Sequence, residues 1–363
     1  MTRRVPILLA CVIGCAHPLR GADPRVGVRL PRDHGAHGDA QTEWWHFHGH
    51  VEDARRRRYD WFLAFVRQHT DVDSVLGVPV RWFVDPFQVA YFSVLDRTTG
   101  RMTYREKHAF PDTWAADARA GALWLRHDSW RAFASRAGRM LMRARAGATS
   151  LEMRMRSVKP PTPMGSGGYV EVPPRSSHHY YTMPRLAAAG TIRVDGEERA
   201  VRGEAWFKHQ WGFLYSDHIA GWTWFGTQLS NGIDLEIALI FDRGWDMAAG
   251  SYAVAVERDG TATRLDLRRI DLQETGETWR SPRTGTVYPT SWAIWIPQRN
   301  AALSLRAVAP DQEMVVFPAN LWAGTLDATG TFDGEAVTGS CFAEIVGLDE
   351  PFGRDLVRTG RPD

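Results

Sequence analysis

The chain has 363 residues, of which 44% are hydrophobic and 24% are charged, and its formal net charge is +2. High hydrophobicity with almost no net charge excludes an intrinsically disordered chain. The 44 basic and 42 acidic residues create no strong positive field, so no nucleic-acid partner is expected. The length suffices for two ordinary domains or one large one. The 16 tryptophans indicate β-structure, a cavity lined by rings, or simply an aromatic-rich core.

Residues 1–15 predict an export signal. Arg3 and Arg4 precede the apolar run VPILLACVIG, which is too short to span a bilayer as a helix. The end of this run, VIGC, resembles a bacterial lipobox with Val12 where Leu is usual. The resemblance implies cleavage before Cys15 and lipidation of its thiol. The alternative is an ordinary signal peptide that is cut nearby.

We therefore expect an exported protein that is lipid-anchored in the cell envelope, with the membrane as a partner through the anchor. Ala16 follows the lipidated position and favours the outer membrane, by analogy with lipoprotein sorting. Without lipidation the protein would be periplasmic or secreted. Cys341 is the one cysteine beyond the signal, so the mature chain can form no internal disulfide. No base is evident beside it, and we expect it to be buried.

Alternation of apolar and polar residues with a period of two dominates the mature chain. Residues 151–156 (LEMRMR) alternate, and residues 233–241 (IDLEIALIF) put five apolar side chains on one face. The dipeptide Asn231-Gly232 before the second run is a strong hairpin signal. No long segment has a convincing helical period. The sequence therefore predicts an all-β protein of antiparallel barrels or sandwiches.

A Pro- and Gly-rich stretch at residues 159–177 divides the chain. Such a stretch cannot hold a central strand, so it is either a linker or a long loop. Strand patterns precede and follow it. We therefore predict two β domains, at residues 23–158 and 178–350, and a tail at residues 351–363.

The first cluster of polar and aromatic residues is TEWWHFHGH at residues 42–50. On a strand, His46, His48 and His50 would share one face and could supply part of a metal site. No CxxC or HExxH motif accompanies them, which favours a structural or ligand-lining role, and no metal or other cofactor is expected. Glu43 stands beside two tryptophans, where desolvation would raise its pKa toward that of a general acid. The alternative is a Glu that is hydrogen-bonded to backbone at a strand start.

Two further clusters mix rings with proton carriers, at residues 178–186 (HHYYTMPRL) and 203–212 (GEAWFKHQWG). Polar groups within aromatic walls are what a small-molecule cavity needs. Strand alternation in the second cluster sends neighbours to opposite faces, with Trp206, Lys208 and Gln210 on one and Phe207, His209 and Trp211 on the other. The candidate ligand-binding rings are Trp44, Trp45, Tyr180, Tyr181, Trp206, Trp211, Trp222 and Trp224.

Three motifs resemble, in this order, the AttH/carotenoid 1,2-hydratase family of lipocalin-like proteins. They are HGAHGDAQTEWWHFHGH at residues 34–50, YYTMPRL at residues 180–186 and GEAWFKHQWG at residues 203–212. The resemblance spans most of the mature chain. It implies two tandem lipocalin-like antiparallel β-barrels or half-barrels around an apolar ligand site. The strand and hairpin patterns agree with that fold.

Hydratase members of that family add water to the terminal double bond of an acyclic carotene. The resemblance implies an acid that protonates the alkene, aromatic faces that stabilise the carbocation, and capture by water. Those enzymes hold a Tyr and an Asp where this chain has Trp206 and Lys208, and a His and a Trp match His179 and Tyr181. The acid implied by the resemblance is therefore absent from this chain.

Lys208 could donate a proton only if burial lowered its pKa, or it could pair with a ligand carboxylate. The alternative is a salt bridge to Glu204, Asp234 or Glu236, or an ammonium that reaches water. Glu43, Glu204 or His209 could replace the missing acid. The candidate catalytic residues are Glu43, His179, Lys208 and His209.

These features predict an exported lipocalin-like protein whose aromatic cavity binds an apolar polyene, isoprenoid or acyl ligand. One alternative is an enzyme that uses the same cavity, a hydratase, cyclase or isomerase of a polyene-like substrate. Another is a non-catalytic accessory of an ABC-type exporter, which would have a transporter as its partner.

Overall fold

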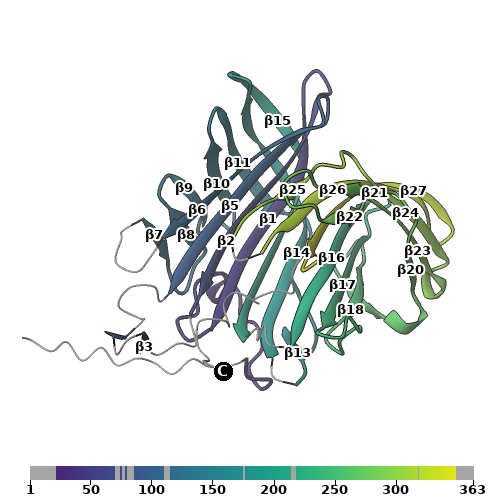
Figure 1. Ribbon diagram of the computed structural model, residues 1–363, viewed down its shortest axis with the longest axis horizontal. Helices are drawn as coiled ribbons and strands as arrows, with labels where there is room; N and C mark the ends of the chain where they lie inside the picture. Colours follow the sequence, from purple (N-terminus) through teal and green to yellow (C-terminus); the bar gives the residue numbers. More distant parts are fainter. Residues whose placement is uncertain are drawn as a thin grey trace, which may run out of the picture.

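The computed structural model describes residues 22–69, 74–75, 78–79, 86–109, 115–174, 176–213, 218–317 and 319–348. These residues form two strongly curved antiparallel sheets that lie against each other (Figure 1). The first sheet is a near-closed barrel and the second is a half-barrel. The predicted all-β fold of two tandem barrels or half-barrels is confirmed.

The first sheet contains strands from the N-terminal 213 residues. They are β1 (Thr42–Asp53), β2 (Arg58–Gln68), β5 (Phe87–Asp96), β6 (Arg101–Ala109), β7 (Ala116–Ala118), β8 (Trp124–His127), β9 (Trp130–Ala134), β10 (Met140–Ala146), β11 (Thr149–Ser157), β14 (Ser176–Val194) and β15 (Glu197–Phe213). Their order across the sheet is β6-β5-β2-β1-β15-β14-β11-β10-β9-β8-β7. Two short strands, β12 (Thr162–Pro163) and β13 (Tyr169–Val172), pair with β14, and β3 (Ser74–Val75) pairs with β4 (Val78–Pro79).

Contacts between the two ends of the first sheet nearly close it into a barrel. Lys107 Nζ on β6 lies 2.9 Å from Asp128 Oδ2, at the turn between β8 and β9. Phe92 on β5 meets Trp130 on β9 edge to face, with ring centroids 5.8 Å apart. The interior of this barrel is therefore enclosed by strands from both ends of the sheet.

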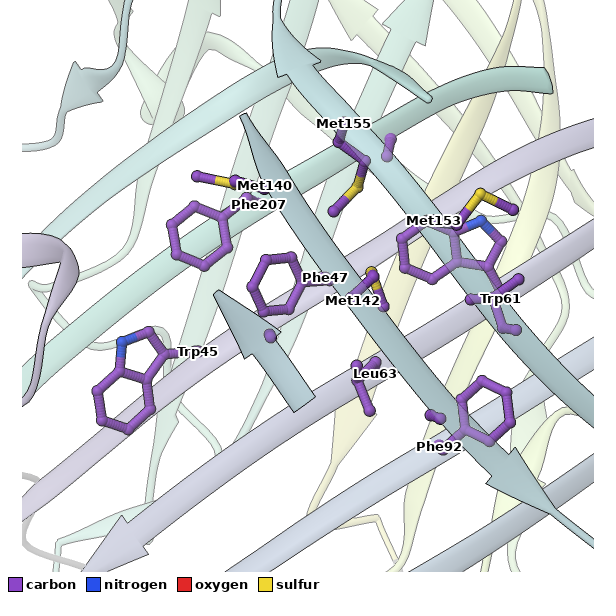
Figure 2. Close-up of a cluster of buried hydrophobic side chains, with 14 of the residues drawn as sticks. Trp45, Phe47, Trp61, Leu63, Phe92, Met140, Met142, Met153, Met155 and Phe207 are labelled. Atoms are coloured by element: carbon purple, nitrogen blue, oxygen red, sulfur yellow. The ribbon is translucent and has the colours of Figure 1, made fainter. Parts of the chain in front are cut away.

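Side chains fill the interior of the first barrel (Figure 2). Phe47 on β1 and Phe207 on β15 stack with centroids 4.5 Å apart. Four buried methionines of β10 and β11 belong to the same cluster, and their flexible thioethers suit the gaps between rings. Burial of these apolar side chains, at roughly 1.5–3 kcal/mol each, is a main source of the stability of this barrel.

The second sheet is formed by strands that follow residue 218. They are β16 (Ile219–Leu229), β17 (Asp234–Asp242), β18 (Tyr252–Val256), β19 (Ala262–Leu265), β20 (Asp271–Glu274), β23 (Ser291–Ile296), β24 (Ala301–Ala307), β26 (Leu321–Phe332) and β27 (Glu335–Val346). Their order is β19-β18-β17-β16-β27-β26-β24-β23-β20, with β25 (Glu313–Met314) paired to β26. β21 (Thr278–Arg280) and β22 (Val287–Pro289) form a separate hairpin. The predicted hairpin at Asn231-Gly232 joins β16 to β17.

The change from one sheet to the other falls between Phe213 and Ile219, not at the predicted domain boundary of 177/178. β14 and β15 continue the first sheet, because β14 pairs with β11 and β15 pairs with β1. The Pro- and Gly-rich segment at residues 159–177 contains β12 and β13, which pair with β14. Its prolines break the strand pattern in the sequence, but short strands with free edges tolerate them.

The two sheets pack through a second apolar cluster that takes residues from both. Phe62 on β2 stacks on Phe342 of β27, with centroids 5.4 Å apart, and Trp206 on β15 meets Trp224 of β16 edge to face at 5.7 Å. Arg185 of β14 adds an ion pair between the sheets, since its Nη2 lies 2.7 Å from Asp234 Oδ1 on β17. The outer face of the first barrel is therefore as buried at this interface as its interior.

The predicted signal, with Cys15, and the predicted tail at residues 351–363 lie outside the described residues. Cys341 is fully buried on β27, as expected. The helices within the described ranges are short 3₁₀ turns at Arg32–His34, Leu267–Arg269 and Pro297–Arg299. None of them has the length and hydropathy needed to cross a bilayer.

Candidate functional site

A cavity lies between the two sheets. One wall comes from β1, β2, β5, β14 and β15 of the first sheet, and the other from β16, β17, β18, β26 and β27 of the second. Most of its lining is aromatic or aliphatic, with seven large rings: Trp44, Phe62, Tyr91, Tyr180, Trp222, Trp224 and Tyr252. This is the composition expected of a pocket for a mainly apolar small molecule.

Strand alternation decides which predicted residues reach this cavity. Neighbours on a strand point to opposite faces, so Lys208 lines the cavity while His209 lies inside the first barrel. The predicted alternation over residues 206–211 is therefore confirmed. Of the eight candidate ligand-binding rings, Trp44, Tyr180, Trp222 and Trp224 line the cavity, Trp206 packs behind Trp224, and Trp45, Tyr181 and Trp211 belong to the barrel interior.

Lys208 is 5% exposed, and the structure gives its ammonium two close partners. Lys208 Nζ lies 3.0 Å from Glu344 Oε2 and 3.6 Å from the centroid of the Trp224 ring. Burial lowers the pKa of Lys208, and the Glu344 carboxylate opposes that shift. A salt-bridge partner was expected among Glu204, Asp234 and Glu236, but the partner is Glu344.

Glu344 holds its charge because two basic groups face it. His46 Nδ1 lies 2.9 Å from Glu344 Oε1, on the side opposite Lys208. Burial alone would raise the pKa of Glu344, but Lys208 and His46 outweigh it and keep that pKa well below its usual range. Burial lowers the pKa of His46, so this ring is neutral at pH 7. The charges of Lys208 and Glu344 therefore neutralise each other within the protein.

Glu236 on β17 is the second buried carboxyl at this interface, and its surroundings differ. Its Oε1 accepts hydrogen bonds from the hydroxyls of Tyr180 and Tyr252, the latter at 2.6 Å, and from Trp224 Nε1 at 2.9 Å. Glu236 Oε2 is buried and has no partner among the described residues. Burial raises the pKa of Glu236, and the three neutral donors offset that only in part. The raised pKa favours the protonated form of this carboxyl, in which Oε2 can act as a donor.

The Trp224 ring reaches Glu236 because Gly226 leaves room for it. The indole lies across Gly226, and a Cβ at that position would overlap the ring. On the other side of the indole stands Lys208. Trp224 therefore contacts both groups, with Lys208 over its ring and Glu236 at its Nε1.

Glu43 was expected to be a general acid with a raised pKa, and the structure corrects this. Glu43 Oε1 lies 2.7 Å from His37 Nδ1 and 3.0 Å from His209 Nε2, and its Oε2 lies 2.9 Å from Arg67 Nη2. Burial would raise the pKa of Glu43, but these partners lower it to about 2. The side chain is fully buried inside the first barrel, away from the cavity between the sheets.

His179 and the three histidines of β1 occupy different places. His179 lies on the barrel side of β14, with its ring centroid 5.4 Å from that of Trp211. His46 and His48 face the second sheet, and His48 stacks on Phe342 at 4.3 Å. His50 lies further along the same face, where burial lowers its pKa to about 3. These three histidines share one face, as predicted, but they do not converge on a common point within the described residues.

Glu236 and Glu344 were not among the site residues predicted from the sequence. Glu236 alternates with apolar residues within 233–241, so a Glu on the second face of a buried strand was the available signal. Glu344 gave no such signal, since it becomes a neighbour of Lys208 only through the pairing of β27 with β16 and the packing of the two sheets.

Comparison with known proteins agrees with the motif resemblance. Residues 21–348 match the family model described as AttH-like, whereas the search of curated proteins gave no match. A protein assigned as AttH from Nitrosomonas europaea has 24% identity and a TM-score of 0.78, and the match covers 92% of this chain and 99% of that one.

Two further crystal structures share the fold. Kievitone hydratase from Nectria haematococca has 14% identity and a TM-score of 0.69, with 90% of this chain and 95% of that chain covered. CghA with Sch210972 has 14% identity and a TM-score of 0.56, with 91% and 98% covered. The family model spans nearly all of the described residues, and the protein therefore belongs to the AttH-like family.

Proposed function

We propose that the cavity between the two sheets binds a neutral, largely apolar small molecule, such as a polyene, an isoprenoid or a neutral acyl compound, and that Glu236 protonates an unsaturated group of this ligand. The observation that carries the proposal is Glu236 Oε2, a buried carboxyl oxygen without a partner among the described residues, on a side chain hydrogen-bonded to three cavity-lining rings. Buried polar atoms are rarely left unpaired, and those that are often serve function.

The charges around the cavity support a neutral ligand. Lys208 is neutralised by Glu344, so it is not free to pair with a ligand carboxylate. Burial raises the pKa of Glu236, which favours its neutral form, and lowers the pKa of His178, a lining residue, to about 3, so that His178 is neutral at pH 7. A charged ligand would lose its hydration here without gaining an opposite charge.

The surroundings of Glu236 suit a proton donor. Transfer of its proton to a double bond leaves a carboxylate, whose charge strengthens the hydrogen bonds from Tyr180, Tyr252 and Trp224. The carbocation is then captured by water, deprotonated, or attacked by a second double bond to give a new carbocation that in turn loses a proton. In each case one proton is released and returns to Glu236. The rings of Trp44 and Trp222, 6.0 Å apart in the cavity wall, offer faces to the cation.

The fold similarity to an enzyme named kievitone hydratase supports a reaction that begins with proton transfer. The presence of Lys208 at the position of the hydratase acid does not oppose it, because Glu236 supplies the acid from β17 of the second sheet. In this proposal Lys208 is a positioning residue that holds Trp224 and Glu344.

Ligand binding is tested with a matched pair of probes, all-trans-retinol and all-trans-retinoate. Retinol should quench tryptophan emission saturably and bind more tightly than retinoate, since the described lining of the cavity offers no cation free of a carboxylate partner. Equal or tighter binding of retinoate would contradict the neutral site.

Catalysis is tested by incubating the protein with an acyclic polyene in D2O and analysing the recovered compounds by mass spectrometry. Wild-type protein should introduce deuterium, and Glu236→Gln should bind the polyene but introduce none. Lack of deuterium with wild type would leave a binding protein, and deuterium with Glu236→Gln would assign the acid elsewhere.

We also propose that the protein is exported and anchored through a lipid on Cys15, on the strength of the lipobox-like sequence. Cells that express the chain should incorporate labelled palmitate into it, and Cys15→Ser should abolish both labelling and processing. A wild-type protein free in the medium, with an N-terminus beyond Cys15, would contradict the anchor.

A further inference from the structure

We infer that His37, Glu43 and His209 bind a divalent transition-metal ion of the zinc class, at the end of the first barrel where β1 begins and β15 ends. This site lies on the opposite face of the first sheet from the cavity and does not depend on the proposed reaction. One nitrogen of each histidine and one carboxylate oxygen lie within 4.8 Å of one another. Two imidazoles and a carboxylate are a common ligand set for zinc.

One nitrogen of each histidine lies close to the same carboxylate oxygen, Glu43 Oε1. His37 Nδ1 lies 2.7 Å and His209 Nε2 lies 3.0 Å from Glu43 Oε1. Arg67 Nη2 occupies the other carboxylate oxygen at 2.9 Å, which fixes the carboxylate plane and leaves Oε1 to the histidines. Three ligand atoms are thus held together before any ion arrives.

The remaining nitrogen of each histidine faces an oxygen. His209 Nδ1 lies 2.9 Å from the backbone carbonyl of Asp33, which can only accept, so this nitrogen carries the hydrogen. In a neutral ring, Nε2 then has only a lone pair to present to Glu43. His37 Nε2 lies 3.5 Å from Asp33 Oδ1, within reach of the same arrangement. Metal-binding histidines typically hold their second nitrogen against a carbonyl or a carboxylate in this way.

Aromatic rings fix both imidazoles, and one side of the cluster is open. Trp211 stacks on His37 with centroids 4.0 Å apart, and Trp45 stacks on His209 at 4.7 Å. Glu43 and His209 are fully buried, whereas the His37 side chain is 18% exposed. An ion can therefore enter past His37 and keep a water molecule there as its fourth ligand, the arrangement of open zinc sites.

The experiment uses the untagged full chain after removal of metals with a chelator. Zn²⁺ is titrated against a chromogenic competitor, and Co²⁺ is added separately to record its visible absorption. We expect one Zn²⁺ per chain, Co²⁺ bands of a site with nitrogen ligands, and a higher Tm with Zn²⁺. His37→Gln and His209→Gln should weaken Zn²⁺ binding by more than 100-fold, and Asp33→Asn by about 10–100-fold.

His48→Gln is the matched control, since His48 is a buried, ring-stacked histidine on the opposite face of β1 and should leave Zn²⁺ binding unchanged. If His209→Gln does not fold, as judged by circular dichroism, the more exposed His37→Gln decides the outcome. Absence of stoichiometric Zn²⁺ binding to the wild type would overturn the inference. Binding of equal strength in wild type and His37→Gln would overturn it as well.

Discussion

The interior of the first barrel and the cavity between the sheets both bury glutamates, but they treat them differently. In the barrel, Glu43 lies against Arg67 and two histidines, and its pKa falls to about 2. At the cavity, Glu236 receives its hydrogen bonds from two tyrosines and a tryptophan, and burial raises its pKa. Both carboxyls are fully buried, so the difference comes from the Arg67 guanidinium beside Glu43, whereas the donors to Glu236 are neutral.

Neutral donors position a carboxyl without holding it ionised, whereas cationic donors do both. Glu344 shows this at the cavity, because Lys208 and His46 keep its pKa below the usual range, whereas burial raises the pKa of Glu236, whose donors Tyr180, Tyr252 and Trp224 are neutral. One carboxyl at this interface is therefore held ionised, and the other is the candidate proton donor of the proposed reaction. The most conspicuous Glu of the sequence, beside two tryptophans, belongs to the ionised kind.

The largest effect is expected when the charged pair of the cavity is broken. Lys208→Met leaves Glu344 buried without its cation, and we expect the free energy of unfolding to fall by about 3–5 kcal/mol, as measured by urea denaturation. The double variant Lys208→Met/Glu344→Gln should recover most of this loss, because no unpaired charge remains. A single variant as stable as wild type would contradict the buried ion pair.

Glu43, the carboxylate inside the barrel, should contribute to stability in a way that depends on pH and is lost in acid. The folded pKa of Glu43, about 2, lies below its ordinary value of 4.5, so its contribution is fully present above pH 4.5 and is lost as the pH falls toward 2. That contribution is about 3 kcal/mol. Glu43→Gln should therefore have a lower free energy of unfolding than wild type at pH 7, and the difference between the two should shrink as the pH falls, as measured by urea denaturation. A difference that stays constant from pH 7 to pH 3 would argue against an ionised Glu43.

Loss of a ring that lines the cavity and loss of a ring in the barrel core should affect ligand binding differently. Trp222→Ala removes a cavity-lining ring and should weaken retinol binding by about 1.5–3 kcal/mol, measured from the quenching of tryptophan emission. Trp61→Phe is the control, because Trp61 belongs to the barrel core and its indole nitrogen has no hydrogen-bond partner among the described residues. Equal losses in both variants would place the ligand elsewhere.

Local patterns in the sequence were enough to predict the strands and their faces. A period of two placed Lys208 and His209 on opposite sides of β15, and this held because both faces of that strand are buried. The same pattern gave the all-β fold and the hairpin at Asn231-Gly232. Motif resemblance then gave the family.

Contacts between distant segments could not be predicted in the same way. The partner of Lys208 is Glu344, which arrives through the last strand of the second sheet. The pKa of Glu43 could not be read from its tryptophan neighbours, because His37, Arg67 and His209 come from other segments. Composition suggested a linker at residues 159–177, but pairing of β12 and β13 with β14 keeps this segment in the first sheet.

The smallest change in stability is expected for the residue most important to the proposed reaction. Glu236→Gln keeps an oxygen that accepts from Tyr180, Tyr252 and Trp224, so hydrogen-bond changes should stay within about 1 kcal/mol. The pKa of Glu236 is higher in the folded protein than in the unfolded chain. Wild type therefore loses stability as the pH rises from the unfolded pKa of Glu236 through its folded pKa. The variant should therefore equal or exceed wild type at pH 7 and lose that advantage below pH 4.5, in urea denaturation at both pH values. Glu236→Leu, which leaves three buried donors unpaired, should be clearly less stable. Strong destabilisation of Glu236→Gln at pH 7 would mean that the native carboxyl is ionised, and it would remove Glu236 as the proton donor.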